Sequence, residues 1–196
     1  MKTSLRKLAI GLFLFGFGTF GGNSLFAAGL PEIKLPKGFR IEVYAEGTEG
    51  ARSLALGGPG VVYVSSRKKG VYALKDIGKG VQAFVVVEGL NTPNGIAWRD
   101  GDLYVAETDR ILRYPGIEKD LARPPMPQVV RADLPAKSHH GARYIAFGPD
   151  GKLYLAIGAP CNVCEPDRFA SGGNDLETAS ITRMNADGSH WETVAR

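Results

Sequence analysis

Cysteine and histidine are scarce in this sequence, and their placement excludes several kinds of site. The 196 residues hold two cysteines and three histidines. Cys161 and Cys164 form a CxxC pair that is followed by Glu165, so the CxxCH motif of haem attachment is absent. A structural zinc site would need two further ligands, which the sequence does not offer. A thioredoxin-type redox motif is disfavoured because no βαβ pattern surrounds the pair.

Long apolar runs are missing apart from one at the N-terminus. Leu8–Phe20 is an uncharged run of 13 residues, which follows three basic residues in Met1–Lys7 and precedes the small residues Ala27–Gly29. This order predicts a secretory signal peptide over residues 1–28, with no stable membrane span left after cleavage. An uncleaved membrane anchor is the alternative. We therefore expect a periplasmic or secreted protein.

An excess of one charge is also missing once the signal peptide is set aside. Residues 1–28 contain three of the 24 basic residues and none of the 20 acidic ones, so the net charge falls from +4 to about +1. The basic residues are dispersed, so the sequence gives no support for a nucleic-acid-binding surface. In an exported chain, the CxxC pair in its Pro-flanked loop predicts a local disulfide between Cys161 and Cys164.

What the sequence does contain is a repeat. Each copy has a short apolar run with an alanine, then a turn rich in Gly, Pro or Asp, an aromatic-bearing strand and a further short strand. The alanines, at positions 55, 97 and 146, recur at intervals of 42 and 49 residues, and the aromatic strands carry Tyr63, Tyr104 and Tyr154. Helical periodicity is confined to residues 116–124, where we expect a short surface turn or helix that ends at Pro124.

A period in the forties with several short antiparallel strands indicates an all-β fold built from propeller blades. The repeat places blades near residues 36–88, 89–135 and 136–196, after the signal peptide. A β-sandwich is the alternative, although it does not explain why the same pattern returns three times. Three blades do not close a ring, so we expect the chain to be part of a longer propeller, with a dimer of half-rings as the other solution.

Several segments of the chain resemble one known family. They are "LPKGFRIEVYAEG" (35–47), "ARSLAL" (51–56), "NTPNGIAWRDGDLYVAE" (91–107), "HHGARYIAFGPDGKLYLAIGAPCNVC" (139–164) and "ITRMNADGS" (181–189). Together they are similar to the glucose/sorbosone dehydrogenase family, and within it to the L-sorbosone dehydrogenase-like, aldose sugar dehydrogenase branch. These are exported quinoproteins with a six-bladed β-propeller and the cofactor pyrroloquinoline quinone (PQQ). The resemblance runs from about Leu35 to the C-terminus and covers the N-terminal half of such a propeller.

The resemblance implies oxidation of an aldose sugar or a sorbosone-like sugar aldehyde. In the family a histidine just before the "FGPDG" strand acts as general base on the sugar hydroxyl while hydride passes to the quinone. His140 occupies that position here. Imidazole suits the task because it accepts protons near neutral pH. A histidine at the mouth of a strand, bonded to backbone, is the alternative.

Four further residues are candidates for contact with the cofactor. Arg52 and Asn94 begin the inner strands of the first two repeats, in the same relative place as His140 in the third. Their alternatives are a surface salt bridge for Arg52 and a turn residue for Asn94. Arg143 could meet the quinone's carboxylates, but it shares a face with His140 only if the strand begins after it. His139 fits a structural or orienting role better than catalysis.

The resemblance also implies calcium, an external electron acceptor such as a cytochrome or quinone, and in some members a homodimer. Asp167, Asp175 and Glu177 offer oxygen ligands for calcium, although their spacing matches no EF-hand and a solvated acidic loop is the default explanation. The competing function is a non-catalytic propeller that binds ligands. A lactonase-like propeller would require a metal, and Asn94 is the only ligand we can place for it.

Overall fold

The computed structural model describes residues 33–163 and 178–195. The predicted signal peptide and the acidic residues Asp167, Asp175 and Glu177 lie outside these ranges. The chain divides into two compact units, Met1–Val43 and Tyr44–Arg196, and every strand described below belongs to the second. Within the described ranges, no helix has the length and apolar character needed to cross a bilayer.

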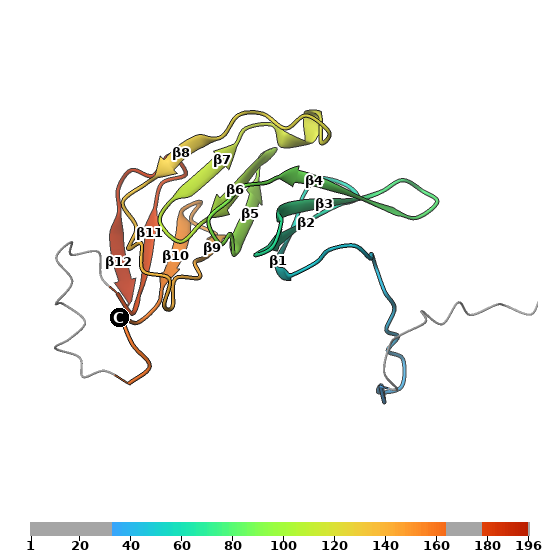
Figure 1. Cartoon of the computed structure of the whole chain (residues 1–196), viewed down its shortest axis with the longest axis horizontal. Helices are drawn as coiled ribbons and strands as arrows, with labels where there is room; N and C mark the ends of the chain where they lie inside the picture. Colours follow the sequence, from blue (N-terminus) through green and yellow to red (C-terminus); the bar gives the residue numbers. More distant parts are fainter. Residues whose placement is uncertain (1–32, 164–177, 196) are drawn as a thin grey trace, which may run out of the picture. The chain divides into compact units, whose positions relative to one another are not determined.

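The second unit consists of three four-stranded antiparallel sheets, which confirms the all-β prediction (Figure 1). In each sheet the strands follow chain order. The first contains β1 (Ala51–Leu56), β2 (Val61–Ser66), β3 (Gly70–Asp76) and β4 (Val81–Val87). The second contains β5 (Gly95–Arg99), β6 (Asp102–Ala106), β7 (Ile111–Tyr114) and β8 (Gln128–Arg131). The third contains β9 (Tyr144–Phe147), β10 (Leu153–Ile157), β11 (Ser180–Met184) and β12 (Glu192–Ala195).

The repeated alanine and tyrosine are cross-strand partners in all three sheets. The pairs are Ala55 with Tyr63, Ala97 with Tyr104, and Ala146 with Tyr154. A small residue opposite a large aromatic one on the neighbouring strand lets the ring cover it, which is a favourable cross-strand arrangement. The repeated alanine and tyrosine therefore occupy the same structural position in each of the three sheets.

Two hydrophobic cores hold the three sheets together. The first core, between the sheets of β1–β4 and β5–β8, includes the fully buried Tyr63, Leu103 and Val105. The second core, between β5–β8 and β9–β12, includes Ile111, Ile145 and Leu155. The central sheet thus buries both faces. Its strands are accordingly apolar on both sides, as in "LYVA", where a strand with one solvated face would alternate.

The turn that follows β7 ties the central sheet to the first. A short 3₁₀ helix, η1 (Ile117–Lys119), buries Ile117 completely, so the expected short surface element also contributes to the core. The Glu118 carboxylate accepts a hydrogen bond from the Gly58 amide at 2.8 Å and one from the Tyr63 hydroxyl at 3.2 Å. A side chain at Gly58 would clash with this carboxylate, which lies 2.4 Å from where its Cβ would stand.

Candidate functional site

The inner strands β1, β5 and β9 begin at the same end of the three sheets, and four of the candidate residues lie there. We call this region the His140 end and define it by Arg52, Asn94, His140 and Arg143. Strand β5 lies between β1 and β9 (Figure 1). Gly95, the first residue of β5, allows the close approach to β9, because a Cβ there would lie 2.6 Å from the Ile145 nitrogen.

Asn94 joins the three sheets at this end. The residue is 7% exposed, and its Nδ2 donates a hydrogen bond to the Arg143 carbonyl at 2.9 Å. Oδ1 accepts a hydrogen bond from Nε of Arg52 at 3.3 Å, and the backbone carbonyl accepts one from the Ser65 hydroxyl at 2.6 Å. A buried amide with both ends bonded fixes its neighbours. The structure therefore brings Arg52, Asn94 and the backbone of Arg143 together.

Arg143 is buried, and its guanidinium donates to three backbone carbonyls. These belong to Thr108 at 3.0 Å, Pro135 at 2.5 Å and His140 at 3.5 Å. Burial lowers the pKa of Arg143, because among the described residues no carboxylate compensates for the lost hydration of its charge. Strand β9 begins at Tyr144, directly after Arg143, so the two-residue alternation of a strand does not govern how Arg143 and His140 face each other.

His140 lies in a turn that holds it in an uncommon conformation. Its φ is +52°, in the left-handed region, and the Gly141 amide closes the turn on the Ser138 carbonyl at 3.0 Å. Gly158, just after β10, leaves room for it, since a Cβ there would lie 2.8 Å from the His140 Cβ. A strained backbone held by its surroundings is a recurring feature of functional sites.

The His140 side chain is exposed and contacts two neighbours. Its Nε2 is 2.7 Å from Oδ1 of Asn162, and the His139 ring lies edge-on with its centroid 4.1 Å away. With Oδ1 as acceptor, Nε2 carries the proton and Nδ1 keeps a lone pair. Asn162 was missed by sequence reasoning. Its signal was its place inside the CxxC segment, in the loop that follows the strand paired with β9.

A second group missed from the sequence is the basic turn between β2 and β3. Ala51 pairs with Ser66, so Arg67, Lys68 and Lys69 lie at the same end of the first sheet as Arg52. The Ser66 hydroxyl orders this turn by accepting the amides of Lys68 and Lys69 at 3.1 and 3.2 Å. Within the described part of the chain, none of these four cations forms an ion pair. The end is therefore able to attract an anionic ligand.

Some of the residues predicted to bind a metal or form a disulfide lie outside the described ranges. No group of three metal-ligating side chains occurs among residues 33–163 and 178–195. Asn94, which the lactonase alternative would use as a metal ligand, has its amide engaged by Arg52 and Arg143. Cys164 lies outside the described residues, so the Cys161–Cys164 disulfide stays a prediction.

Comparison with known proteins identifies the architecture. The PQQ domain of pyranose dehydrogenase from Coprinopsis cinerea matches with a TM-score of 0.66 at 18% identity, over 82% of this chain and 40% of that one. A putative glucose dehydrogenase from Thermus thermophilus matches with a TM-score of 0.60 at 21% identity, over 76% of this chain and 48% of its own. The fold is a β-propeller. The three sheets are three of its blades.

Two further comparisons bear on this propeller. PQQ-bound aldose sugar dehydrogenase from Streptomyces coelicolor matches with a TM-score of 0.58 at 24% identity, over 76% of this chain and 48% of that one. An uncharacterized protein of Borreliella burgdorferi is 24% identical over 147 residues, 69% of this chain and 38% of its own length. No protein-family model matches the chain. The chain spans less than half the length of each of these four proteins.

Proposed function

We propose that this chain belongs to a PQQ-dependent dehydrogenase that oxidises an aldose sugar or a sorbosone-like sugar aldehyde, in the periplasm or outside the cell. The observation that carries the proposal is the His140 end. An exposed histidine, backed by a partly buried network from three blades, shares this end with cations that form no described ion pair, in a fold that PQQ sugar dehydrogenases share. Since the chain spans less than half of these neighbours, other blades would complete the pocket.

The residues at this end suit the cofactor's charge. PQQ is a planar tricarboxylate, and Arg52 with the turn Arg67–Lys69 presents cations that no described carboxylate neutralises. An arginine matches a carboxylate with two parallel hydrogen bonds, so Arg52 is the contact we assign first. His139 would lie against the same ligand. Bound PQQ supplies the two-electron acceptor for the hydride that leaves the sugar carbon.

His140 is the residue to which we assign proton abstraction. The Nε2 contact with Asn162 orients the ring, and Nδ1 is the nitrogen left to take the proton of the substrate hydroxyl. Arg143 and Asn94 act as positioning residues. Arg143 holds the His140 carbonyl, and Asn94 holds the carbonyl of Arg143, so the buried network fixes the backbone that carries the base.

The remaining features follow the resemblance. Calcium would assist cofactor binding, with Asp167, Asp175 and Glu177 as the candidate ligands in this chain. Electrons would pass to an external cytochrome or quinone, and a homodimer is the oligomeric state to look for. The Cys161–Cys164 disulfide would hold the loop that carries Asn162 against His140, which gives the CxxC segment a part in the site.

The test compares two histidines that share a backbone conformation. His140 and His190 have φ values of +52° and +55°, so alanine at either position meets the same backbone cost. The full-length protein that contains this chain and the blades completing the pocket, supplied with PQQ and calcium, is expected to reduce a redox dye with aldoses or sorbosone as substrate. His140→Ala should lower kcat by about 100-fold or more, the usual effect of removing a general base. His190→Ala should leave kcat unchanged. A wild-type full-length protein without turnover, or equal activity in the two variants, overturns the proposal.

A further inference from the structure

A second polar site lies at the other end of the same strands. It is a pocket of about 530 Å³ between the central and third sheets, within the range of about 300–1,000 Å³ typical of small-molecule sites. We call it the Tyr104 pocket, and its lining residues are Arg99, Asp100, Asp102, Tyr104, Arg113, Gly151, Asn185, Ala186 and Asp187. The four residues of β9 separate it from the His140 end by about 13 Å of extended chain.

The hydroxyl of Tyr104 is the feature that suggests a ligand in this pocket. The same tyrosine occurs in each sheet, and two of the three hydroxyls have protein partners. Tyr63 donates to Glu118 at 3.2 Å and Tyr154 donates to Asp150 at 3.0 Å. Tyr104 as a residue is only 3% exposed, and its hydroxyl has no hydrogen-bond partner among the described residues. The hydroxyl is not one of the fully enclosed side-chain atoms without a partner, so it is reachable from the pocket and open to bonding by a ligand or water.

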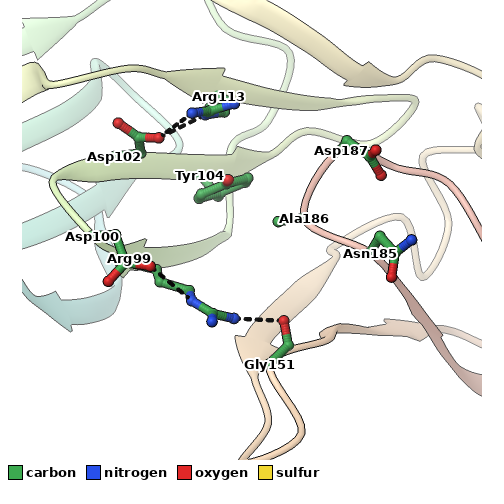
Figure 2. Close-up of a pocket in the computed structure, with 9 residues that line it drawn as sticks. All are labelled: Arg99, Asp100, Asp102, Tyr104, Arg113, Gly151, Asn185, Ala186 and Asp187. Atoms are coloured by element: carbon green, nitrogen blue, oxygen red, sulfur yellow. Dashed lines mark hydrogen bonds and ion pairs between the residues drawn. The ribbon is translucent and has the colours of Figure 1, made fainter.

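The surroundings of Tyr104 set the chemistry of a ligand. Figure 2 shows its ring between the side chains of Arg99 and Arg113, facing the wall formed by Asn185, Ala186 and Asp187. Burial raises the pKa of Tyr104, so at neutral pH the hydroxyl is uncharged and can both donate and accept. The pocket thus offers an uncharged polar group at the base of a charged rim.

Both arginines of that rim already pair with carboxylates of the protein. Arg113 pairs with Asp102, and Arg99 pairs with Asp100 and donates to the Gly151 carbonyl at 2.5 Å. With Asp187, three acidic residues face two basic ones, so the lining favours no anion. Nη2 of Arg99 and Nη1 of Arg113 donate to no other described residue. Asp187 uses Oδ1 for both of its bonds to Ser189, which leaves Oδ2 as an acceptor.

Donors and acceptors that alternate around an uncharged hydroxyl suit a ligand whose own groups both donate and accept. Each hydroxyl of a sugar ring does so, whereas a carboxylate or phosphate only accepts. We propose that the Tyr104 pocket binds a neutral polyhydroxylated ring, a carbohydrate unit, through Tyr104, Arg99, Arg113 and Asp187. This site is separate from the His140 end and binds without oxidising its ligand.

Binding of methyl α-D-glucoside tests the proposal, because this sugar has no free C1 hydroxyl to oxidise. The full chain is titrated by ligand-observed NMR in the wild type and four variants. Tyr104→Phe removes only the hydroxyl, and we expect binding about three- to tenfold weaker, the worth of one hydrogen bond. Asp187→Asn, at the exposed rim, replaces an acceptor by a donor and should weaken binding by a similar factor.

Two further variants serve as controls. Tyr154→Phe removes the equivalent hydroxyl of the third sheet, and His140→Ala removes the proposed base, so both should bind the glucoside as the wild type does. Loss of oxidation in His140→Ala with intact binding separates this site from the proposed activity. The inference fails if the wild type does not bind the glucoside, if Tyr104→Phe and Asp187→Asn bind it unchanged, or if gluconate binds more tightly than the glucoside.

Discussion

The two ends of the strands use polar residues in opposite ways. At the His140 end, Asn94 and Arg143 are buried, and their bonds run from one sheet to the next, mostly to backbone carbonyls. At the Tyr104 pocket, the arginines pair with aspartates of their own sheet, and these pairs are partly exposed. The first arrangement ties together the backbone of three sheets, while the second reaches a neighbouring sheet at one backbone atom, where Arg99 donates to the Gly151 carbonyl at 2.5 Å. Preorganisation is therefore built at the His140 end.

The sharpest way to break this contrast is to remove one arginine from each end. Arg143→Ala leaves three carbonyls without their donor, two of them in short, well-formed bonds, and opens a buried space. We expect the free energy of unfolding to fall by about 3–5 kcal/mol, measured by urea denaturation. Arg183→Ala is the matched control. Its partners Asp150 and Glu192 are exposed to solvent, so stability should change little. Equal losses in the two variants would contradict the contrast.

A glycine from each end tests the same difference through packing. At Gly95 a Cβ would meet backbone atoms of β9, at 2.6 Å from the Ile145 nitrogen and 2.7 Å from the Arg143 oxygen. Backbone atoms cannot move away by a change of rotamer, so Gly95→Ala should lower the free energy of unfolding by about 2–3 kcal/mol. It should also lower dye reduction, because it shifts the strand that follows Arg143.

Gly148→Ala provides the control for this prediction. Gly148 follows β9 near the Tyr104 pocket, and its Cβ would meet the Tyr154 ring at 2.5 Å and the Asp150 carboxylate at 2.8 Å. Both are side-chain atoms that can rotate away, so the loss of stability should be the smaller of the two. Thermal unfolding of the two variants side by side measures the difference. A larger loss in Gly148→Ala would show that the two inner strands do not depend on their close approach.

Much of the fold was readable because it repeats. The Ala–Tyr pairs take the same position in each sheet. The intervals of 42 and 49 residues between the alanines were therefore enough to predict three sheets of one kind. The fourth strand of each sheet, β4, β8 and β12, was not identified from the pattern. All three are outer edge strands: every residue of β12 ("ETVA") and two of four in β8 are exposed, and β4 is buried only at Val86 and Val87. A strand exposed over much of its length shows a weak apolar pattern.

The sequence predicted where the candidate site lies, but it did not predict which groups its side chains contact. Strand order within a blade placed Arg52, Asn94 and His140 at one end, but the role of Arg143 depends on three carbonyls that lie up to 35 residues away in the chain. Every residue has a backbone carbonyl, so the amino-acid sequence does not show which carbonyl accepts a hydrogen bond from a side chain. Asn162 and the basic turn Arg67–Lys69 were missed for a related reason, since only the pairing of strands shows which loops share an end.

The smallest expected effect concerns the acid limit of stability near the Tyr104 pocket. Hydrogen bonds from the Lys152 amide and the Tyr154 hydroxyl, and the charge of Arg183, lower the pKa of Asp150 below its ordinary value of 3.8. A carboxyl whose pKa is lower in the folded state stabilises the protein above its unfolded pKa. That contribution is lost as the pH falls through the folded value. The wild type should therefore exceed Asp150→Asn in stability at pH 6, and the gap should close as the pH drops below about 3.8.

Urea denaturation of both proteins between pH 6 and pH 2.5 measures this gap. Asp150 is exposed, so the gap is expected to be much smaller than the loss in Arg143→Ala. Salt provides the control, because 0.5 M NaCl screens the Arg183 charge and leaves the Lys152 amide bond in place. Part of the gap should then remain at high salt. A gap that stays constant from pH 6 to pH 2.5 would mean that the carboxylate is not what orders this turn, and that even the exposed end is held by its backbone.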